Sequence, residues 1–252
     1  APWTETSPEL KADGIQRYQE LIGQLRWAVK IARVDILLEV SLMLSYLDMP
    51  RIGHLEQALH IFGYLKAKPK RKLAFDPGHP HISKDRFQKC DWTEFYRDAE
   101  EAIPPNMPKP KGHGMSTHCF VDANHVGDTK TRQSQTGILL FCNKAPVIWH
   151  SKRQNSVEAS TFGSEFTAMK NAVEMIKALR YKLRMFGVPI EGPTNVYCDN
   201  GSVCKNGTRP NSTLTKRHHS IAYHRMRKAV AAETICVTKE GTLTNLSDLF
   251  SK

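Results

Sequence analysis

Apolar residues in the first quarter of the chain recur every three or four positions, which is the spacing of one face of an α-helix. The pattern falls into three runs, at residues 21–32, 36–44 and 55–65. Because such helices bury one face and expose the other, we expect residues 15–66 to form a set of packed helices.

The helical pattern is lost between residues 76 and 113, where prolines accumulate. The last part of this stretch, residues 103–114, combines Pro with Gly and Lys and is typical of a stiff linker. We therefore place a domain boundary here, with a mainly helical segment at 1–114 and a second domain at 115–252.

After the linker, β-branched and aromatic residues dominate three short stretches, which predict strands. A long helical stripe follows them and predicts a helix. Five further elements are expected: a strand, a short helix, a basic helix, a strand and a final helix. The expected bounds of the first three strands are 117–123, 137–142 and 145–149, and those of the long helix are 160–186. The five further elements follow in order: a strand at 194–198, a short helix that starts at 200 or 201, a basic helix at 215–232, a strand at 234–239 and a final helix at 245–250. This order predicts an α/β domain in which helices cover the faces of a mixed sheet.

The formal net charge of the chain is +11, and most of it lies in the second domain. From Met115 onward there are 19 Lys and Arg against 10 Asp and Glu, whereas the preceding residues hold 17 and 15. A basic domain beside a nearly neutral one indicates a polyanionic partner, most often nucleic acid. A merely soluble basic surface would carry the same charge.

No stretch approaches the roughly 18 apolar residues of a membrane-spanning helix, so we expect no membrane partner. The six cysteines show no zinc-binding spacing. Several lie in apolar runs, as Cys142 and Cys198 do, where a thiol behaves as a small hydrophobe. We interpret the cysteines as reduced core thiols of an intracellular protein.

Four acidic residues of the second domain stand in apolar surroundings. Asp122 lies within a predicted strand, and Asp199 directly follows another. Glu165 lies early in the long helix beside its core-facing stripe, and Asp248 lies in the last helix. Because removing a carboxylate from water is costly, a strand Asp in such a place requires a cation, a Lys or Arg partner, or a raised pKa.

Each acidic residue has a simpler interpretation when taken alone. Asp199 could cap the following helix, and Asp248 could favour a helix N-terminus. Glu165 could be partly solvated, and Asp122 could pair with a neighbouring base. All four together, on elements that a sheet would bring close, favour one shared site. Mg²⁺ binds through carboxylates and substrate phosphates, and two such ions can act together on a phosphodiester.

At these residues the chain resembles the ribonuclease H domain of the polyproteins of copia-type LTR retrotransposons. The matching motifs follow one another over about 130 residues: Phe120-Val-Asp-Ala-Asn124 with Gly127-Asp128, Arg132-Gln-Ser-Gln-Thr-Gly137, Trp149-His-Ser-Lys-Arg-Gln154, Glu158-Ala-Ser-Thr-Phe-Gly-Ser-Glu-Phe166, Tyr197-Cys-Asp-Asn200 and Asn245-Leu-Ser-Asp-Leu-Phe-Ser-Lys252. The resemblance implies a ribonuclease H-like fold and hydrolysis of the RNA strand of RNA–DNA hybrids. It also implies that two Mg²⁺ ions, or Mn²⁺ in their place, are held by Asp122, Glu165, Asp199 and Asp248.

The resemblance implies a separate role for each ligand. Asp122 is expected to bridge both ions, and Asp199 to touch metal directly. Glu165 is expected to hold the ion on the side of the substrate 2′-OH, the group by which a protein distinguishes RNA from DNA. Asp248 is expected to hold the ion that activates water.

Upstream segments resemble the thumb and connection of a reverse transcriptase. They are Tyr18-Gln-Glu-Leu-Ile-Gly-Gln-Leu-Arg-Trp27, Arg33-Val-Asp-Ile36 and His54-Leu-Glu-Gln-Ala-Leu-His-Ile-Phe-Gly-Tyr-Leu65. The chain contains no Tyr-x-Asp-Asp motif, so we expect no DNA synthesis from it. The implied partners are an RNA–DNA hybrid and the rest of the reverse transcriptase polyprotein, and the implied location is a cytoplasmic virus-like particle or the nucleus.

Further polar residues are candidates for contact with nucleic acid: Lys152, Arg153, Gln154, Asn200, Lys216, Arg217 and His218. The first three could equally form an ordinary solvated turn. The basic helix, which also carries Arg225, Arg227 and Lys228, could bind phosphate. His218, His219 or His224 could help to protonate the leaving group, and the sequence does not choose among them. Trp149 and Tyr197 are expected in the core.

Two other functions fit part of the pattern. An integrase or transposase would show the order Asp, Asp, Glu, and copia-type integrases carry an upstream His/Cys zinc module. The order here is Asp, Glu, Asp, Asp, and no such module is present. The main alternative is an inactive or decayed remnant that binds nucleic acid or serves a structural role. Two departures from the family pattern raise this possibility, although neither removes a metal ligand: Arg217-His-His-Ser220 lacks an acidic residue, and Gly201 replaces a larger one.

Overall fold

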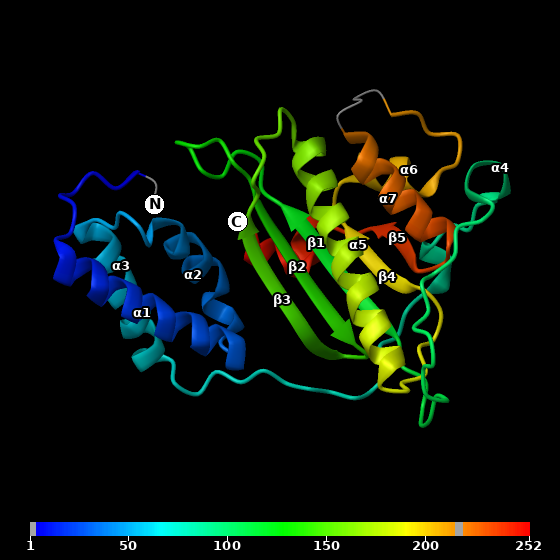
Figure 1. The fold of residues 1–252 in the computed structure, drawn as a ribbon, viewed down its shortest axis with the longest axis horizontal. Helices are drawn as coiled ribbons and strands as arrows, with labels where there is room; N and C mark the ends of the chain where they lie inside the picture. Colours follow the sequence, from blue (N-terminus) through cyan, green and yellow to red (C-terminus); the bar gives the residue numbers. More distant parts are fainter. Residues whose placement is uncertain (1–3, 215–218) are drawn as a thin grey trace.

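The computed structural model describes residues 4–214 and 219–252. Its N-terminal part consists of three α-helices, α1 (Ala12–Ile31), α2 (Leu37–Met43) and α3 (Ile52–Ala67). Short 3₁₀ helices at Val34–Ile36 and Leu44–Tyr46 flank α2. These helices confirm the mainly helical segment that the apolar spacing predicts, and Figure 1 shows them as one group beside the sheet.

The second part is built on a five-stranded mixed sheet with the order β3-β2-β1-β4-β5. Its strands are β1 (Thr117–Ala123), β2 (Gln135–Cys142), β3 (Ala145–Arg153), β4 (Thr194–Cys198) and β5 (Ile235–Lys239). The first three strands pair antiparallel, whereas β1, β4 and β5 run parallel. The mixed sheet expected from the order of elements is confirmed.

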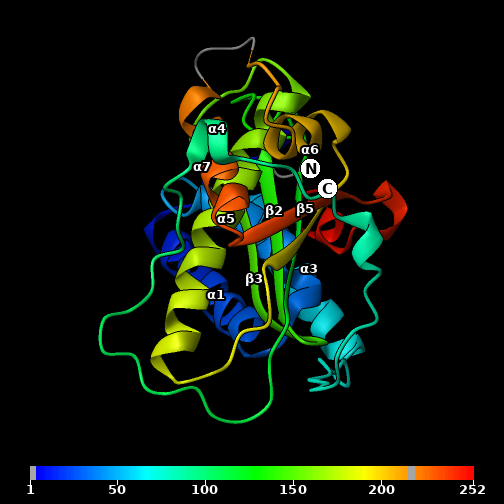
Figure 2. The same cartoon turned by 90° about the vertical axis from the view of Figure 1, so that its right-hand side faces the viewer.

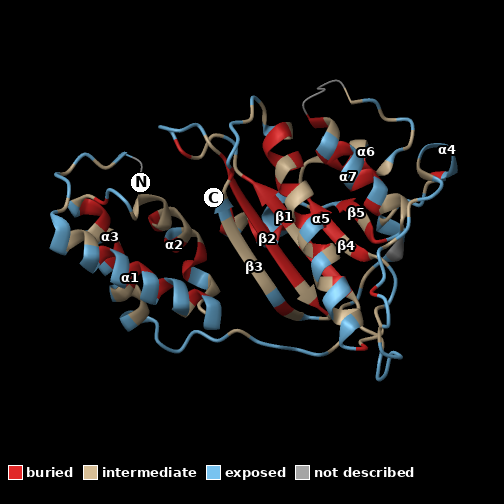
Figure 3. Cartoon of the chain, in the orientation of Figure 1, coloured by how far each residue is buried: buried red, intermediate tan, exposed pale blue. Residues whose placement is uncertain are grey.

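Three helices accompany the sheet: α5 (Thr161–Met185), α6 (Gly201–Thr208) and α7 (Ser220–Ala231). Side chains alternate across β2, so that Ile138 and Leu140 pack in the core beneath α5. Leu139 packs in a second core on the opposite face. Because both faces of the central strands β1 and β2 are covered, all but one residue of each of them is buried (Figure 3).

The N-terminal helices cover the face of the sheet opposite α5. The second core joins buried residues of α1 and α2, such as Leu25 and Val40, to the sheet. Two hydrogen bonds reinforce this packing: Trp149 Nε1 donates to the carbonyl of Val29 (3.0 Å), and Ser41 Oγ donates to the carbonyl of Ser151 (2.8 Å). The helices are therefore packed directly against β3.

The stretch between α3 and β1 crosses to the β5 edge of the sheet, as Figure 1 shows. It includes the short 3₁₀ helix Lys84–Arg86 and helix α4 (Thr93–Tyr96), which Figure 2 shows beside α7. Arg86 Nη2 contacts Glu240 at 2.7 Å. Glu101 accepts hydrogen bonds from Arg180 and Arg184 of α5. Residues ahead of the expected boundary at 114 thus pack on the second domain.

Arg227 of the basic helix is enclosed by aromatic rings. Its guanidinium lies 4.9 Å from the ring centre of Trp92 and 4.6 Å from that of Tyr223, and its side chain is buried. Such cation–π contacts satisfy a cation without solvent. Arg227 is therefore a packing residue, and the expectation that it binds phosphate is wrong.

The expected C-terminal helix is instead the 3₁₀ helix η7 (Leu246–Phe250). A side chain on Gly137 of β2 would meet the carbonyl oxygen of Ser247 at 2.5 Å, so η7 packs directly against the strand backbone. This close packing against the sheet sets the 3₁₀ geometry of η7. The local sequence pattern carries no information about the packing. In the described parts of the chain, no helix combines the length and apolar character needed to cross a membrane.

Candidate active site

Asp122 lies in β1, and Asp199 directly follows the adjacent strand β4 at the same edge of the sheet. β1 and β4 are parallel, and Val121 pairs with Cys198, so the next residue along each strand is one of the two aspartates. Neighbouring strands lie about 4.8 Å apart. The register alone therefore places these two acidic residues side by side.

Glu165 comes from the N-terminal part of α5. Ser160 caps this helix, its side chain accepting a hydrogen bond from the Gly163 N–H. Glu165 lies a little over one turn further along, with a relative exposure of 3%. Its carboxyl group interacts with the backbone of Ala123 at the end of β1. The packing of α5 on the sheet thus directs Glu165 toward the strand that carries Asp122.

Asp248 comes from the C-terminal segment. The side chain of Asn245 anchors this segment, since Nδ2 donates to the carbonyl of Val121 (3.0 Å) and Oδ1 accepts from the Ser247 N–H (3.3 Å). Ser251 Oγ then donates a hydrogen bond to the carboxylate of Asp122. The segment is therefore held against β1, and the four acidic residues come from β1, α5, the end of β4 and η7.

Lys252 supplies a positive charge inside this cluster. Its ammonium group contacts the carboxylate of Asp248 and lies 3.4 Å from Asp122 Oδ2. The sequence left open that Asp122 pairs with a base, and this contact shows such a pairing. The Lys252 side chain is 43% exposed, so it can also turn toward solvent.

The acidic residues influence one another electrostatically. Burial raises the pKa of Asp122, the hydrogen bond from Ser251 and the charge of Lys252 lower it, and the charges of Asp199 and Asp248 raise it further. Burial also raises the pKa of Glu165 to about 9, with added contributions from Asp122 and Asp199. Crowded carboxylates of this kind favour a bound cation, because its charge offsets their repulsion.

Two oxygens test whether the cluster fits a divalent cation. Asp122 Oδ1 and Glu165 Oε2 are both buried, and neither has a hydrogen-bond partner among the residues that the structure describes. Leaving a buried acceptor unsatisfied costs about 1–3 kcal/mol or more for a charged group. A set of carboxylate oxygens with unused acceptors matches the preference of Mg²⁺ and Mn²⁺ for oxygen ligands. The residues present therefore fit such ions.

The simpler interpretation of Asp199 as a helix cap is not what the structure shows. Asn200 caps α6 instead, and its Oδ1 accepts from the N–H groups of Ser202 (3.0 Å) and Val203 (3.2 Å). Asp199 remains half-buried at the sheet edge, where Thr242 Oγ1 donates to it at 3.4 Å. The capping oxygen of Asn200 is engaged in the helix, which leaves Asp199 available to the cluster.

The predicted contacts with nucleic acid differ in their accessibility. Lys152 is exposed at the end of β3, whereas Arg153 donates to Asp128 Oδ2 at 2.9 Å. Gln154 is only 5% exposed, and its Nε2 donates to Thr136 Oγ1 and to the carbonyl of Ser164. Gln154 therefore supports the start of α5 from inside the fold, and we leave it out of the proposed contact surface.

Lys216, Arg217 and His218, which the sequence also suggests, lie outside the described residues. Of the other candidate histidines, His219 is buried, with Nε2 3.5 Å from Glu158 Oε2. His224 contacts the hydroxyl of Tyr96 at 2.5 Å, on the side of α4. The contacts described for these two histidines are with residues other than the four carboxylates. Tyr197 stacks on Phe120 with ring centres 4.8 Å apart, which confirms its place in the core.

The interpretation of the sequence missed three residues near the cluster: Cys198, Ser251 and Lys252. Cys198 directly precedes Asp199, and its thiol lies with carboxylate oxygens of Glu165 and Asp199 in a group whose members are all within 4.8 Å of one another. Lys252 lies four positions after Asp248, a spacing that joins side chains on a helical turn. That spacing was a signal that could have identified Lys252.

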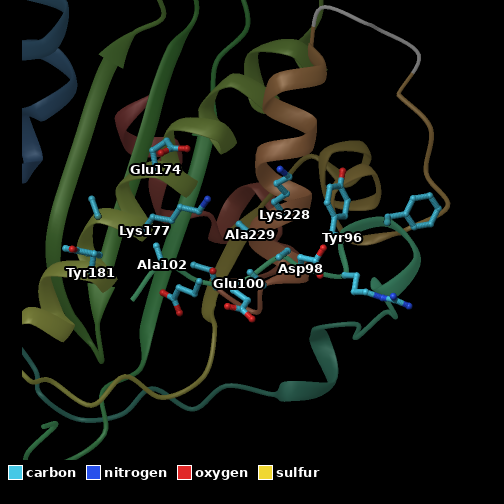
Figure 4. Close-up of a pocket in the computed structure, with 16 residues that line it drawn as sticks. Tyr96, Asp98, Glu100, Ala102, Glu174, Lys177, Tyr181, Lys228 and Ala229 are labelled. Atoms are coloured by element: carbon cyan, nitrogen blue, oxygen red, sulfur yellow. The ribbon is translucent and has the colours of Figure 1, made fainter. Parts of the chain in front are cut away.

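A hollow of about 710 Å³ lies away from the carboxylates. Figure 4 shows it between the 95–102 segment, α5 and α7, with Glu174, Lys177 and Lys228 among its lining residues. Glu174 is nine positions beyond Glu165, which is roughly 14 Å along the helix. The lining mixes acidic and basic side chains and shows no convergent set of ligands, so we assign the chemistry to the carboxylate cluster.

Comparison with known proteins identifies relatives that cover nearly the whole chain. The retrovirus-related Pol polyprotein from transposon RE2 of Arabidopsis thaliana is 23% identical over 98% of this chain. The corresponding polyprotein from transposon TNT 1-94 of Nicotiana tabacum is 26% identical over 93% of this chain. The chain spans about 15% of the length of either relative. No family model matches the chain.

Among solved structures, RNase H1 of Halobacterium salinarum NRC-1 is 16% identical, and the match covers 54% of this chain and 94% of that protein, with a TM-score of 0.41. LC11-RNase H1, solved in complex with an RNA/DNA hybrid, is 12% identical with the same coverage and a TM-score of 0.42. The sequence matches to the transposon polyproteins confirm the resemblance seen in the motifs: over most of its length this chain is similar to the retrovirus-related Pol polyproteins of transposons.

Proposed function

We propose that this chain is a metal-dependent endoribonuclease that hydrolyses the RNA strand of RNA–DNA hybrids as part of a retrotransposon reverse transcriptase polyprotein. The observation that carries the proposal is the convergence of Asp122, Glu165, Asp199 and Asp248 from four separate elements, with buried acceptor oxygens left unpaired on two of them. A structural cluster would have those oxygens hydrogen-bonded.

The four carboxylates would hold two Mg²⁺ ions, for which Mn²⁺ could substitute. Bound divalent ions lower the pKa of water and stabilise charge on the leaving oxygen of a phosphodiester. The chain supplies the surroundings for this chemistry. The apolar packing of Phe166 and Met169 beneath the cluster keeps α5 fixed on β1, and Asn245 fixes the segment that carries Asp248.

Basic side chains near the cluster could receive the phosphate backbone. In the register of the sheet, Lys152 of β3 lies opposite Thr136 of β2. The next residue of β2, Gly137, lies opposite Asp122 of β1. Lys152 thus lies two strands away at the same end of the sheet, roughly 10 Å from Asp122 across the sheet. Because its side chain is exposed, Lys152 can bind a phosphate of a strand that crosses this edge.

Cleavage of a labelled RNA–DNA hybrid with Mg²⁺, and with EDTA in its place, tests the proposal. We expect Mg²⁺-dependent cutting of the RNA strand, and a loss of at least about 100-fold in Asp122→Asn and Glu165→Gln. Glu174→Gln is the matched control, because Glu174 lies on the same helix and its partner Arg225 is exposed. Undiminished cutting by Asp122→Asn, or equal cutting in EDTA, would contradict the proposal.

One observation favours a second function, an inactive remnant that binds nucleic acid. The ammonium group of Lys252 already lies against Asp122 and Asp248, where it satisfies part of the negative charge. Binding of the hybrid without any cutting, at every Mg²⁺ and Mn²⁺ concentration tested, would select this function over hydrolysis.

A further inference from the structure

Cys198 places a thiol beside two of the four carboxylates. The residue ends β4 and is fully buried, and its sulfur lies with one oxygen of Glu165 and one of Asp199 in a group whose members are all within 4.8 Å of one another. Hydrolysis through oxygen ligands makes no use of a sulfur atom. The thiol belongs to the core beneath α5, and the proposed function makes no use of its position beside the carboxylates.

A second observation indicates that this group is suited to a ligand. Glu165 is buried, with a relative exposure of 3%, and its Oε2 has no hydrogen-bond partner in the described parts of the chain. A buried carboxylate oxygen without a donor is rare in folded proteins. Glu165, which carries the unsatisfied acceptor, belongs to the same group as the thiol, so one cation could bind both residues.

We propose that Cys198, Glu165 and Asp199 form a binding site for a thiophilic divalent cation of the zinc class. Thiolate ligands select such ions over Mg²⁺ and Mn²⁺. In a tetrahedral zinc site with sulfur at about 2.3 Å and oxygen at about 2.0–2.2 Å from the metal, ligand atoms lie roughly 3.5 Å apart. The three ligand atoms, now within 4.8 Å of one another, therefore need to approach by roughly 1.3 Å at most.

Binding exchanges one set of bonds for another without any redox step. A metal–sulfur bond forms, the S–H bond of Cys198 breaks, and its proton passes to solvent together with water released from the cation. Zinc keeps its oxidation state. The cation would occupy Glu165 and Asp199, which the proposed function assigns to Mg²⁺, so we expect thiophilic ions to block hydrolysis.

Absorption spectroscopy on the full chain tests the sulfur ligand directly. The protein is stripped of metal with EDTA, exchanged into chelator-free buffer and titrated with Cd²⁺ or Co²⁺, and the thiolate-to-metal charge-transfer band is followed. For the natural sequence, we expect the charge-transfer band to appear and to saturate at one equivalent of metal per chain. Cys198→Ala and Cys198→Ser should lose it, and Cd²⁺ affinity should fall by at least about 10–100-fold.

Cys142→Ala is the matched control, because Cys142 is a buried strand thiol on β2, away from the cluster. It should keep both the band and the affinity. A band that survives Cys198→Ser, or no band at all in the natural sequence, would overturn the inference. If both Cys198 variants fail to fold, cadmium NMR on the unaltered chain decides the question, since a sulfur ligand and an all-oxygen site differ strongly in chemical shift.

The site shares two residues with the proposed nuclease, but the two ideas fail separately. A chain that binds Cd²⁺ through sulfur and never cuts the hybrid contradicts only the nuclease proposal. A chain that cuts with Mg²⁺ and shows no thiolate band contradicts only the metal site described here.

Discussion

Lys252 Nζ lies 3.4 Å from Asp122 Oδ2, so the most deeply buried carboxylate of the cluster has a lysine as its neighbour. The same ammonium group contacts Asp248. In the absence of a divalent ion, this single positive charge offsets part of the repulsion among the acidic residues. A divalent ion entering the cluster would compete with Lys252 for the same oxygens.

Lys252→Met should therefore have opposite effects on stability and on metal binding. Without divalent ions, the free energy of unfolding should fall by about 1 kcal/mol, a modest value because the lysine is part-exposed, and Tm by about 2–4 °C. Mg²⁺ should bind more tightly, because its competitor is gone. Thermal unfolding in EDTA and calorimetric titration with Mg²⁺ measure the two effects. Lys182→Met, an exposed change at the far end of α5, should alter neither. Weaker Mg²⁺ binding by Lys252→Met would show that the lysine supports the site.

The raised pKa of Glu165 predicts a pH dependence of stability. In the unfolded chain Glu165 ionises near 4.5, whereas in the folded protein its pKa is about 9. Between these values the native state holds an extra proton, so this contribution to stability is fully present below pH 4.5 and is lost as the pH rises through 9. Denaturant unfolding in EDTA should show a smaller decline between about pH 5 and pH 9 for Glu165→Gln than for the natural sequence. Parallel pH profiles for the two proteins would rule out the raised pKa, and Glu174→Gln should leave the profile unchanged.

The contacts of Glu101 with Arg180 and Arg184 predict that residues before 115 stabilise the second domain. Burial would raise the pKa of Glu101, but hydrogen bonds from Arg180 and Arg184 outweigh it and lower the pKa to about 2. Glu101→Gln leaves the buried Arg180 without its counter-charge, so we expect a loss of about 3 kcal/mol in the free energy of unfolding. Urea unfolding at neutral pH measures this loss. Glu100→Gln, an exposed neighbour, should cost almost nothing. Equal stability of the two variants would contradict a stabilising role of Glu101.

The ion pair of Glu101 also predicts an effect of acid. Because the folded pKa is depressed, the stabilisation that it brings is present above the unfolded pKa of 4.5 and is lost as the pH falls toward 2. The difference in stability between Glu101→Gln and the natural sequence should therefore shrink across this range. A difference that stays constant would assign the loss to packing.

The close approach of the C-terminal segment to Gly137 predicts that a larger residue at this position would disturb the packing of that segment. A methyl group at this position would meet the carbonyl oxygen of Ser247 at 2.5 Å, which is closer than packing allows. Gly137→Ala should destabilise the protein by about 1–3 kcal/mol and expose the amides of residues 246–251 to hydrogen exchange. Gly23→Ala in α1 is a control of opposite sign, because nothing lies within 4 Å and alanine favours a helix by about 0.5–1 kcal/mol. Protected amides in Gly137→Ala would contradict the prediction.

Local patterns of apolar residues are sufficient for most of the elements. The long helix expected at 160–186 is Thr161–Met185, and the first strand has the predicted bounds, Thr117–Ala123. Helical and strand periods repeat over a few residues, so they can be read from the chain directly. The same applies to the choice of acidic residues, because a carboxylate within an apolar strand is unusual wherever the strand lies in the fold.

Tertiary packing alone decides which of these groups meet. The register that places Asp122 beside Asp199 joins strands some 77 positions apart, and Lys252 reaches Asp122 from 130 positions away. Packing against Gly137 gives the last helix its 3₁₀ form, and aromatic contacts withdraw Arg227 from solvent. Sequence periodicity carries information about neighbours within one helical turn or along one strand. These contacts instead depend on how whole elements dock. Docking depends on the shapes of all the buried side chains together.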